Sequence, residues 1–478
     1  MTESMRIIDS PDLDSHFGVL HELLIAAAQG NDEARLMGDA ARASIIDSLV
    51  VTDRSVWLLL AVLTGSLPTS EQVITWRRRA AREGVAAFIA ALTASRKAKS
   101  HGVRIVVGGV CVDAHHTVGT SLSTGIQRVV RNVMDRWQDT HEIAILAWDG
   151  EYQALRQVPP GSHRDPSLGA KSDRTPVIPW AGTYLLPELA VERPRLERIQ
   201  ALAEFSGNSS GVIGFDLVPV TSAETAGPGM PAAFSENLAA VARTDRVATI
   251  SAAAGEEYSG WRLMIESAGL VGPEIVAIGL PVEPIPESAD PLDPRAELGL
   301  GGAPLVVCVG SHEPRKNHLA VLHAAEIMWR EGHDFELVFC GGNAWNSERF
   351  VARLGELRSA GRPVSTHSRT SDAVLDALVR AARFTVFPSL NEGYGLPVAE
   401  SLAVGTPVIT SNFGSMAEIA AAGGCLLVDP RNDADLAAGM RRLLVDDVKL
   451  RELRVESLAR PHGSWSAYAD ELWAFLVG

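Results

Sequence analysis

The sequence predicts an α/β protein with two doubly wound, Rossmann-like domains behind a small helical region. Three observations support this prediction. Apolar runs typical of strands alternate with helical segments from about residue 303 to residue 447. The same alternation recurs less regularly over residues 104–278, and a proline-rich polar stretch at 281–291 separates the two parts. We therefore expect a linker at that stretch, between domains at residues 101–280 and 281–460.

The second domain carries the more regular pattern. Its expected strands are short apolar runs that end at glycine, proline or polar residues, at positions 305–309, 335–340, 384–387, 407–410 and 425–428. Such runs are typical of parallel strands covered by helices on both faces. Because these sheets bind ligands at the carboxyl ends of their strands, we expect the following loops to form the site.

The first domain has five candidate strands, at residues 104–112, 142–147, 211–217, 246–251 and 275–278. Between the first two, apolar residues follow the spacing of one helical face, at positions 126, 129, 130, 133, 134 and 137. This pattern predicts an amphipathic helix that starts near Gly125.

Residues 1–100 show helical spacing of apolar residues such as Val73, Trp76 and Phe88, and no strand pattern precedes His101. We expect a small helical appendage there. It could serve docking or oligomerisation, or be simple structural padding.

The most informative stretch is FTVFPSLNEGYGLPVAESLA, residues 384–403. Glu392 falls in the turn after a strand, and Glu400 falls on the first turns of the following helix. Gly393 and Gly395 allow the backbone to approach a ligand, so that N–H groups and the helix dipole can face an anion. Carboxylates on both sides suit sugar hydroxyls. The pattern indicates a nucleotide-sugar site, and the alternative is an ordinary glycine turn with two solvated acids.

A second motif, Glu-Pro-Arg-Lys, follows the apolar run at 305–309 and contains Arg315 and Lys316. Arginine offers a planar fork for phosphate oxygens and lysine a mobile charge, so the pair can neutralise a diphosphate as a glycosidic bond breaks. Alone, a basic pair at a helix start is usually solvent-facing charge. The glutamate motif downstream favours the functional interpretation.

Together these stretches resemble the E-x7-E and E-P-R-K motifs of retaining glycosyltransferases with the GT-B fold, of the group 1 or family 4 type. The resemblance implies two Rossmann-like domains that face a cleft, with a final helix at 461–478 that crosses back to the first domain. It implies catalytic roles for Glu392, which approaches the donor hexose, and for Arg315 and Lys316 at the diphosphate. It implies donor contacts at Glu400, which holds the ribose, and at Gly393, Tyr394, Gly395, Leu396, Gly125 and Ser311.

The acceptor side departs from the family in one place. Many members of this family carry histidine or tyrosine before the aspartate in a phrase at the end of a strand, where this chain has Phe215 before Asp216. Asp216 stays an acceptor-side candidate, with His115 and His116 at the end of an earlier strand. Phe215 cannot carry a proton, and the loop at 366–372 lacks the family's glycine segment near the nucleobase.

Composition excludes several other functions. A formal net charge of −15 argues against a nucleic-acid-binding protein. The longest apolar run, near residues 56–63, is too short to span a bilayer, and the first residues lack a signal-peptide pattern. We expect a cytoplasmic protein, with local basic patches that allow peripheral association with the inner face of a membrane.

No metal or cofactor is expected besides the donor substrate. The sequence Asp433-Ala434-Asp435 resembles a metal-binding signature. However, it opens an amphipathic helix, where the helix dipole stabilises acidic side chains. No C-x-x-C spacing occurs among the cysteines, which are Cys111, Cys308, Cys340 and Cys425.

The resulting prediction is a retaining hexosyltransferase that uses a nucleoside diphosphate sugar and a glycan or lipid-linked acceptor, in cell-surface polysaccharide or glycoconjugate synthesis. One alternative is a GT-B-fold epimerase or phosphorylase. The other is a non-catalytic protein that binds sugar nucleotides or acts as a scaffold.

Overall fold

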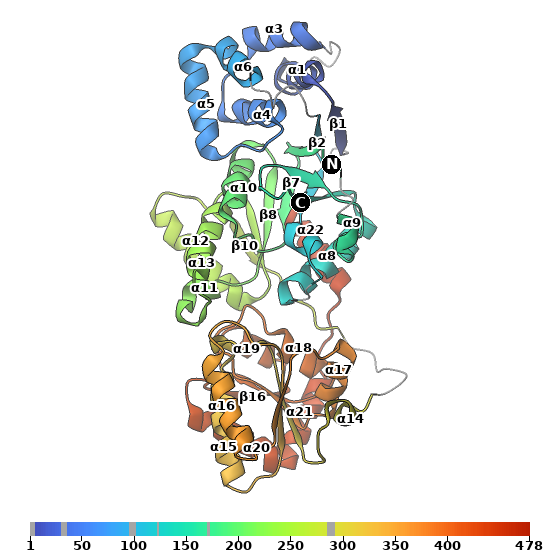
Figure 1. Ribbon diagram of the computed structural model, residues 1–478, viewed down its shortest axis with the longest axis vertical. Helices are drawn as coiled ribbons and strands as arrows, with labels where there is room; N and C mark the ends of the chain where they lie inside the picture. The colour runs from blue at the N-terminus through green and yellow to red at the C-terminus, as the bar shows by residue number, and fades with distance from the viewer. Residues whose placement is uncertain (1–4, 30–35, 95–101, 122–123, 170–172, 284–291) are drawn as a thin grey trace.

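The computed structural model describes residues 5–29, 36–94, 102–121, 124–169, 173–283 and 292–478. Figure 1 shows three parts stacked along the long axis: N-terminal helices, a middle part built on one sheet, and a C-terminal part built on another. Two α/β units preceded by helices are the predicted fold class. The expected linker lies mostly outside the described residues, which resume at position 292.

The N-terminal region packs several helices around α4 (Asp53–Thr64), whose side chains are buried from Ser55 to Leu63. Thr52 and Ser55 form a capping box at its start, and Gly65 ends it with a left-handed backbone, φ 65°. The other main helices are α1 (Leu13–His21), α3 (Gly38–Ser48), α5 (Ser70–Glu83) and α6 (Val85–Thr93).

One element of this region contradicts the sequence analysis. The strand β1 (Arg6–Ser10) pairs antiparallel with β2 (Val103–Val107), so the expectation of no strand before His101 is wrong. The strand is short and lies at the edge of the sheet, with only two of its five residues buried. Its partner comes almost a hundred residues later, and local patterning cannot report such a pairing.

In the described residues, the middle part has a ten-stranded sheet in the order β1-β2-β6-β5-β4-β3-β7-β8-β9-β10. Its further strands are β3 (Val110–Asp113), β4 (Ile143–Trp148), β5 (Leu155–Gln157), β6 (Pro176–Trp180), β7 (Thr183–Leu186), β8 (Ser209–Gly214), β9 (Arg246–Thr249) and β10 (Glu274–Ala277). All neighbours pair in parallel except those that involve β1 or β5. The sequence analysis missed β5 to β7, which are three to five residues long and include two prolines.

The predicted strand at 104–112 is broken in the structure into β2 and β3. The break coincides with a second bend, between β6 and β7, where Ala181 has φ 51°. A Cβ atom on Gly182 would lie 2.3 Å from the carbonyl oxygen of Gly109, so the two backbones cross in close contact. Glycine at position 182 leaves the room that this close approach needs.

The helices of the middle part cover this sheet. They are α7 (His115–Gly119), α8 (Gly125–Thr140), α9 (Pro166–Gly169), α10 (Arg193–Phe205), α11 (Val218–Thr221), α12 (Met230–Val241) and α13 (Ala252–Ser267). The C-terminal helix α22 (Trp465–Leu476) also lies here, against α8, β8 and β9. Trp137 of α8 donates its indole N–H to the carbonyl of Ala469 at 3.0 Å.

The C-terminal part has a six-stranded parallel sheet in the order β13-β12-β11-β14-β15-β16. The strands are β11 (Leu305–Val309), β12 (Glu336–Cys340), β13 (Val364–His367), β14 (Phe384–Phe387), β15 (Val408–Ser411) and β16 (Cys425–Val428). The helices are α14 (Pro294–Leu298), α15 (His318–Arg330), α16 (Glu348–Ser359), α17 (Asp372–Ala381), α18 (Leu396–Ala403), α19 (Gly414–Ala420), α20 (Asp433–Val445) and α21 (Asp447–Leu458). The sequence analysis missed β13, whose last residues fall in the segment that it treated as a loop.

This strand order places a topological switch point between β11 and β14. Successive strands run outward from β11 on one side and from β14 on the other. Doubly wound sheets bind ligands in the crevice at such a point, at the carboxyl ends of the two central strands. The loops after β11 and β14 are those that carry the basic pair and the two glutamates.

Replacement of Gly182 by alanine tests the paired bend. The added methyl group would meet the backbone of Gly108 and Gly109, which cannot move without disturbing the pairing of β3 with β7. We expect Gly182→Ala to lower the free energy of unfolding by about 1–3 kcal/mol, the usual cost of overpacking. Urea unfolding followed by tryptophan fluorescence should show a lower midpoint.

Gly260→Ala is the matched control, because Gly260 lies on an exposed face of α13 with open space around its Cβ position. Alanine there should raise stability by roughly 0.5–1 kcal/mol. An unchanged midpoint in Gly182→Ala would show that the two bends do not constrain each other.

Candidate functional site

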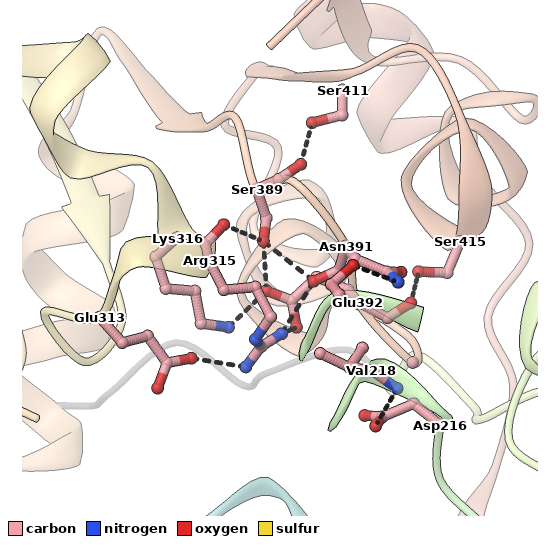
Figure 2. A network of polar contacts seen from close by, with 12 residues as sticks. Asp216, Val218, Glu313, Arg315, Lys316, Ser389, Asn391, Glu392, Ser411 and Ser415 are labelled. Carbon is pink, nitrogen blue, oxygen red and sulfur yellow. Dashed lines mark hydrogen bonds and ion pairs between the residues drawn. The ribbon is translucent and has the colours of Figure 1, made fainter. Parts of the chain in front are cut away.

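The basic pair and the first glutamate of the sequence motifs meet at the switch point. Nη1 of Arg315 lies 2.5 Å from Oε2 of Glu392, and Nζ of Lys316 lies 2.5 Å from Oε1. Ser389 donates a hydrogen bond to the same Oε1 at 2.7 Å. On its other side Arg315 contacts Glu313 at 2.6 Å. Figure 2 shows the two cations converging on the Glu392 carboxylate from the loop after β11.

Burial makes these ion pairs strong. The side chain of Glu392 is 9% exposed, and those of Arg315 and Lys316 are 17% and 11% exposed. Burial alone would raise the pKa of Glu392, but the charges of Arg315 and Lys316 outweigh it and lower the pKa to about 2. Burial likewise opposes the charge of Arg315, and Glu392 and Glu313 raise its pKa above the ordinary value. The site therefore holds fixed charges at neutral pH.

The turn that carries Glu392 is held by hydrogen bonds. Ser415 donates to the carbonyl of Glu392 at 2.8 Å, and Arg315 donates to the carbonyl of Asn391 at 2.9 Å. Gly395 precedes α18 with φ 116°, where a Cβ atom would lie 2.0 Å from the methyl carbon of Met416. Only glycine fits this position, and α18 begins directly after it without a side-chain cap.

Glu400 lies on α18 at a different part of the crevice. It forms an ion pair with Arg128 of α8, on the middle part of the molecule. Both residues line a cavity of about 180 Å³ together with Val309, Asp372, Leu375, Asp376, Val379 and Pro397. The two motif glutamates thus bind different cations in this structure.

The middle part closes over the Glu392 turn. Ser251 donates to the carbonyl of Gly393 at 2.6 Å, and a Cβ atom on Gly393 would lie 2.2 Å from the carbonyl oxygen of Phe215. Nearby, Glu418 of α19 accepts from the N–H groups of Ala252 and Ala253 at 3.0 Å each, at the start of α13. These contacts hold the middle part against the C-terminal part at the crevice.

Asp216 lies beside this turn on the middle part. A Cβ atom on Gly393 would lie 3.0 Å from the Cβ atom and from one carboxylate oxygen of Asp216. Burial raises the pKa of Asp216 to about 6, and the charge of Arg315 only partly opposes this effect. An acid with such a pKa can exchange protons near neutral pH.

Three further donor-side candidates lie around the same crevice. Gly125 begins α8, and its Cβ position lies 3.4 Å from the side chain of Leu396 at the start of α18. Ser311 lies in the loop after β11, with its carbonyl accepting from the N–H of Glu313. Tyr394 is buried, and its hydroxyl donates to the carbonyl of Leu280 at 2.9 Å, which links the turn to the end of the middle part.

The structure ties His115 and His116 into a buried charged network of the middle part. At its centre the fully buried Arg195 lies 2.9 Å from Asp113 and 2.9 Å from Glu188. Glu188 also accepts from the N–H of His116 at 2.7 Å, and the ring of His115 accepts from the N–H of Trp148 at 3.2 Å. This network fixes the start of α7 at the carboxyl end of β3.

Sequence reasoning missed Arg128, Asn391 and Arg195. Arg128 and Asn391 fall inside stretches that carried motifs, but nothing in their own spacing marks them. Asn391 donates to Glu257 of α13 at 3.2 Å, across the crevice. Arg195 lies on α10, where an isolated arginine looks like surface charge until the fold surrounds it.

Among the described residues, no group of three or more histidine, cysteine, aspartate or glutamate residues is arranged to hold a metal ion. Asp433 and Asp435 open α20, and Asp435 accepts from the N–H of Asp429 at 2.7 Å. Within the same residues, no helix has both the length and the apolar character needed to cross a bilayer.

Parts of this chain are similar in sequence to known proteins. Residues 293–457 match the family described as "Glycosyl transferases group 1". The chain is 27% identical over 342 residues to the serotype-specific mannosyltransferase WbdA of Escherichia coli, which covers 67% of this chain and 39% of WbdA. It is 33% identical over 141 residues to the O-antigen chain mannosyltransferase B of Escherichia coli, which covers 29% of this chain and 36% of that protein. The chain thus matches about two fifths of the length of these curated relatives.

Solved structures confirm the expected GT-B architecture. The α,α-trehalose 6-phosphate synthase of Burkholderia multivorans superposes with a TM-score of 0.54 at 16% identity, covering 77% of this chain and 98% of its own. The sucrose-phosphate synthase of Thermosynechococcus elongatus gives 0.52 at 18% identity, with 77% and 97% covered.

Because of the ion pairs of Glu392, the folded state should become less stable as the pH falls. Its pKa is lowered from the ordinary 4.5 to about 2, so the pairs stabilise the folded state above the ordinary value. That contribution is lost as the pH falls from 4.5 toward 2. Because glutamine cannot titrate, the melting temperatures of wild type and Glu392→Gln should differ most near neutral pH. The difference should shrink below about pH 5, and a constant difference down to about pH 3 would contradict the assignment.

Proposed function

Because its C-terminal domain belongs to the glycosyl transferases group 1, we propose that this protein is a retaining glycosyltransferase. It moves a hexose from a nucleoside diphosphate sugar to a glycan or lipid-linked acceptor. The observation that carries the proposal is the convergence of Arg315, Lys316 and Glu392 at the switch point, next to the uncapped start of α18. The names of the two mannosyltransferases favour mannose as the hexose and a cell-surface polysaccharide as the product.

The leaving diphosphate is the group that the basic pair would stabilise. Arg315 and Lys316 are already held in place by Glu392, Glu313 and the Asn391 carbonyl, so they need little reorganisation when charge develops. When the cations turn to the diphosphate, Glu392 is released toward the hexose. Because these two cations can neutralise the diphosphate, we propose a reaction that needs no metal ion.

The acceptor hydroxyl would approach from the middle part, where Asp216 lies beside the Glu392 turn. With a pKa of about 6, Asp216 is ionised at neutral pH and can accept a proton that leaves the hydroxyl. Phe215 cannot carry a proton, which leaves this task to Asp216 or to the leaving diphosphate. A front-face, ion-pair-like path accounts for retention. A lipid-linked acceptor would bring the protein to the inner face of a membrane.

A donor panel tests the function. Thermal-shift measurements with UDP, GDP and dTDP sugars should show one base and hexose that raise the melting temperature selectively, because a ligand stabilises the state it binds. With that donor, hexose transfer should retain the anomeric configuration and persist in EDTA. Binding without transfer or hydrolysis would favour the non-catalytic alternative. Complete loss in EDTA, restored by a divalent ion, would contradict the metal-free proposal.

Substitution of the charged residues separates their roles. Arg315→Ala or Lys316→Ala should reduce kcat/KM by the equivalent of about 2–4 kcal/mol, as when a preorganised electrostatic donor is removed. Glu392→Gln should chiefly lower kcat, since the hexose changes charge during the reaction, whereas Glu400→Gln should chiefly weaken donor affinity.

Calorimetry with the bare nucleoside diphosphate is the control, because this ligand has the ribose and lacks the hexose. If its affinity falls in Glu392→Gln and is unchanged in Glu400→Gln, the two roles are reversed. Near-normal kcat/KM in both Arg315→Ala and Lys316→Ala would show that the two cations have no role in the reaction.

A further inference from the structure

Arg128 reaches from the middle part to the proposed ribose ligand. It lies on the first turn of α8, and its guanidinium pairs with the Glu400 carboxylate on α18. The side chain of Arg128 is 47% exposed and that of Glu400 is 29% exposed, so solvent reaches both. The carboxylate that would hold a ribose is therefore already occupied by a cation from the opposite half of the crevice.

The charges that line the cavity at Glu400 are unbalanced. Of its eight lining residues, Asp372, Asp376 and Glu400 are acidic and Arg128 is basic. Asp376 also pairs with Arg380 on its own helix, at 2.8 Å. A diphosphate that enters next to these acids needs a compensating positive charge, and Arg128 is the lining residue able to supply it.

Two helix starts meet at the same place. Gly125, the first residue of α8, packs next to Leu396, the first residue of α18. Neither helix has an acid in its first turn or a side-chain cap on its N-terminal N–H groups. Both dipoles therefore add positive potential close to Arg128, which favours an anion between the two helices.

We propose that Arg128 is a donor-positioning residue that exchanges partners on binding. In this structure it holds Glu400, and when a nucleoside diphosphate binds it turns to the diphosphate and releases Glu400 to the ribose. The inference rests on the proposed function, because it needs Glu400 to face the nucleotide. It adds a contact from the middle part that joins the two halves of the crevice around the donor.

The exchange predicts opposite effects for two ligands. A bare nucleoside must break the Arg128–Glu400 pair and offers Arg128 no new partner, so removing Arg128 should help it bind. A nucleoside diphosphate gains a charge-assisted contact to Arg128, so removal of Arg128 should lower the affinity for the nucleoside diphosphate. A residue that merely shaped the pocket would change both affinities in the same direction.

Calorimetry with Arg128→Ala tests the inference, using uridine and UDP or guanosine and GDP, whichever base the wild type binds. The nucleoside should bind roughly two- to fivefold more tightly, the size expected for a half-exposed ion pair. The diphosphate should bind about tenfold more weakly, the size of a lost charge-assisted hydrogen bond. In a Glu400→Gln background, the gain for the nucleoside should disappear.

Arg136→Ala is the matched control, because Arg136 lies on α8 and donates to Asn132 of the same helix. It should leave both affinities unchanged, and Arg128→Lys should recover part of the diphosphate affinity. If Arg128→Ala changes the affinities for both ligands in the same direction, or changes neither affinity, the inference fails and the proposed function stands. If the wild type binds no nucleoside diphosphate, both fail.

Discussion

The pairing of one buried carboxylate with two cations is the constraint on which the site depends. Glu392, Arg315 and Lys316 are all mostly buried, and any of them alone would carry a large desolvation cost. Together they offset that cost, and this requires the loops after β11 and β14 to lie side by side. The strand order of the C-terminal sheet provides that arrangement. Gly395 then lets the turn pass close to Met416 and into α18.

The same turn joins the two halves of the molecule. Gly393 contacts Ser251 and Phe215 of the middle part, and Asn391 reaches Glu257. The turn that carries Glu392 is therefore in direct contact with the backbone next to Asp216.

The sequence was sufficient for the fold class, for the strands of the C-terminal sheet other than β13, and for placing Arg315, Lys316 and Glu392 in loops after neighbouring strands. It did not predict the ion pairs between them. Each predicted feature has a local signal: an apolar run, a glycine turn or a charged pair after a strand. Strands β1, β5, β6 and β7 have no such signal, because each is only three to five residues long. In addition, β6 contains two prolines, and β1 is stabilised by a partner almost a hundred residues later. Arg128 and Arg195 were also missed. Their roles arise from residues on other elements, Glu400 for one and Asp113 with Glu188 for the other.

In this structure, each charged residue proposed to bind the donor already has a partner from the protein itself. Arg315 and Lys316 hold Glu392, and Arg128 holds Glu400. Inorganic phosphate could replace Glu392 at the basic pair but would leave the released carboxylate with only its hydrogen bond from Ser389. A nucleoside would take Glu400 from Arg128 and offer Arg128 no new partner. A nucleoside diphosphate sugar brings anionic oxygens for the cations and hydroxyl groups for both carboxylates. Since a buried charge is costly when it loses its partner, the ion pairs of Glu392 act against partial ligands and favour the complete donor. The more exposed Arg128–Glu400 pair adds a smaller effect.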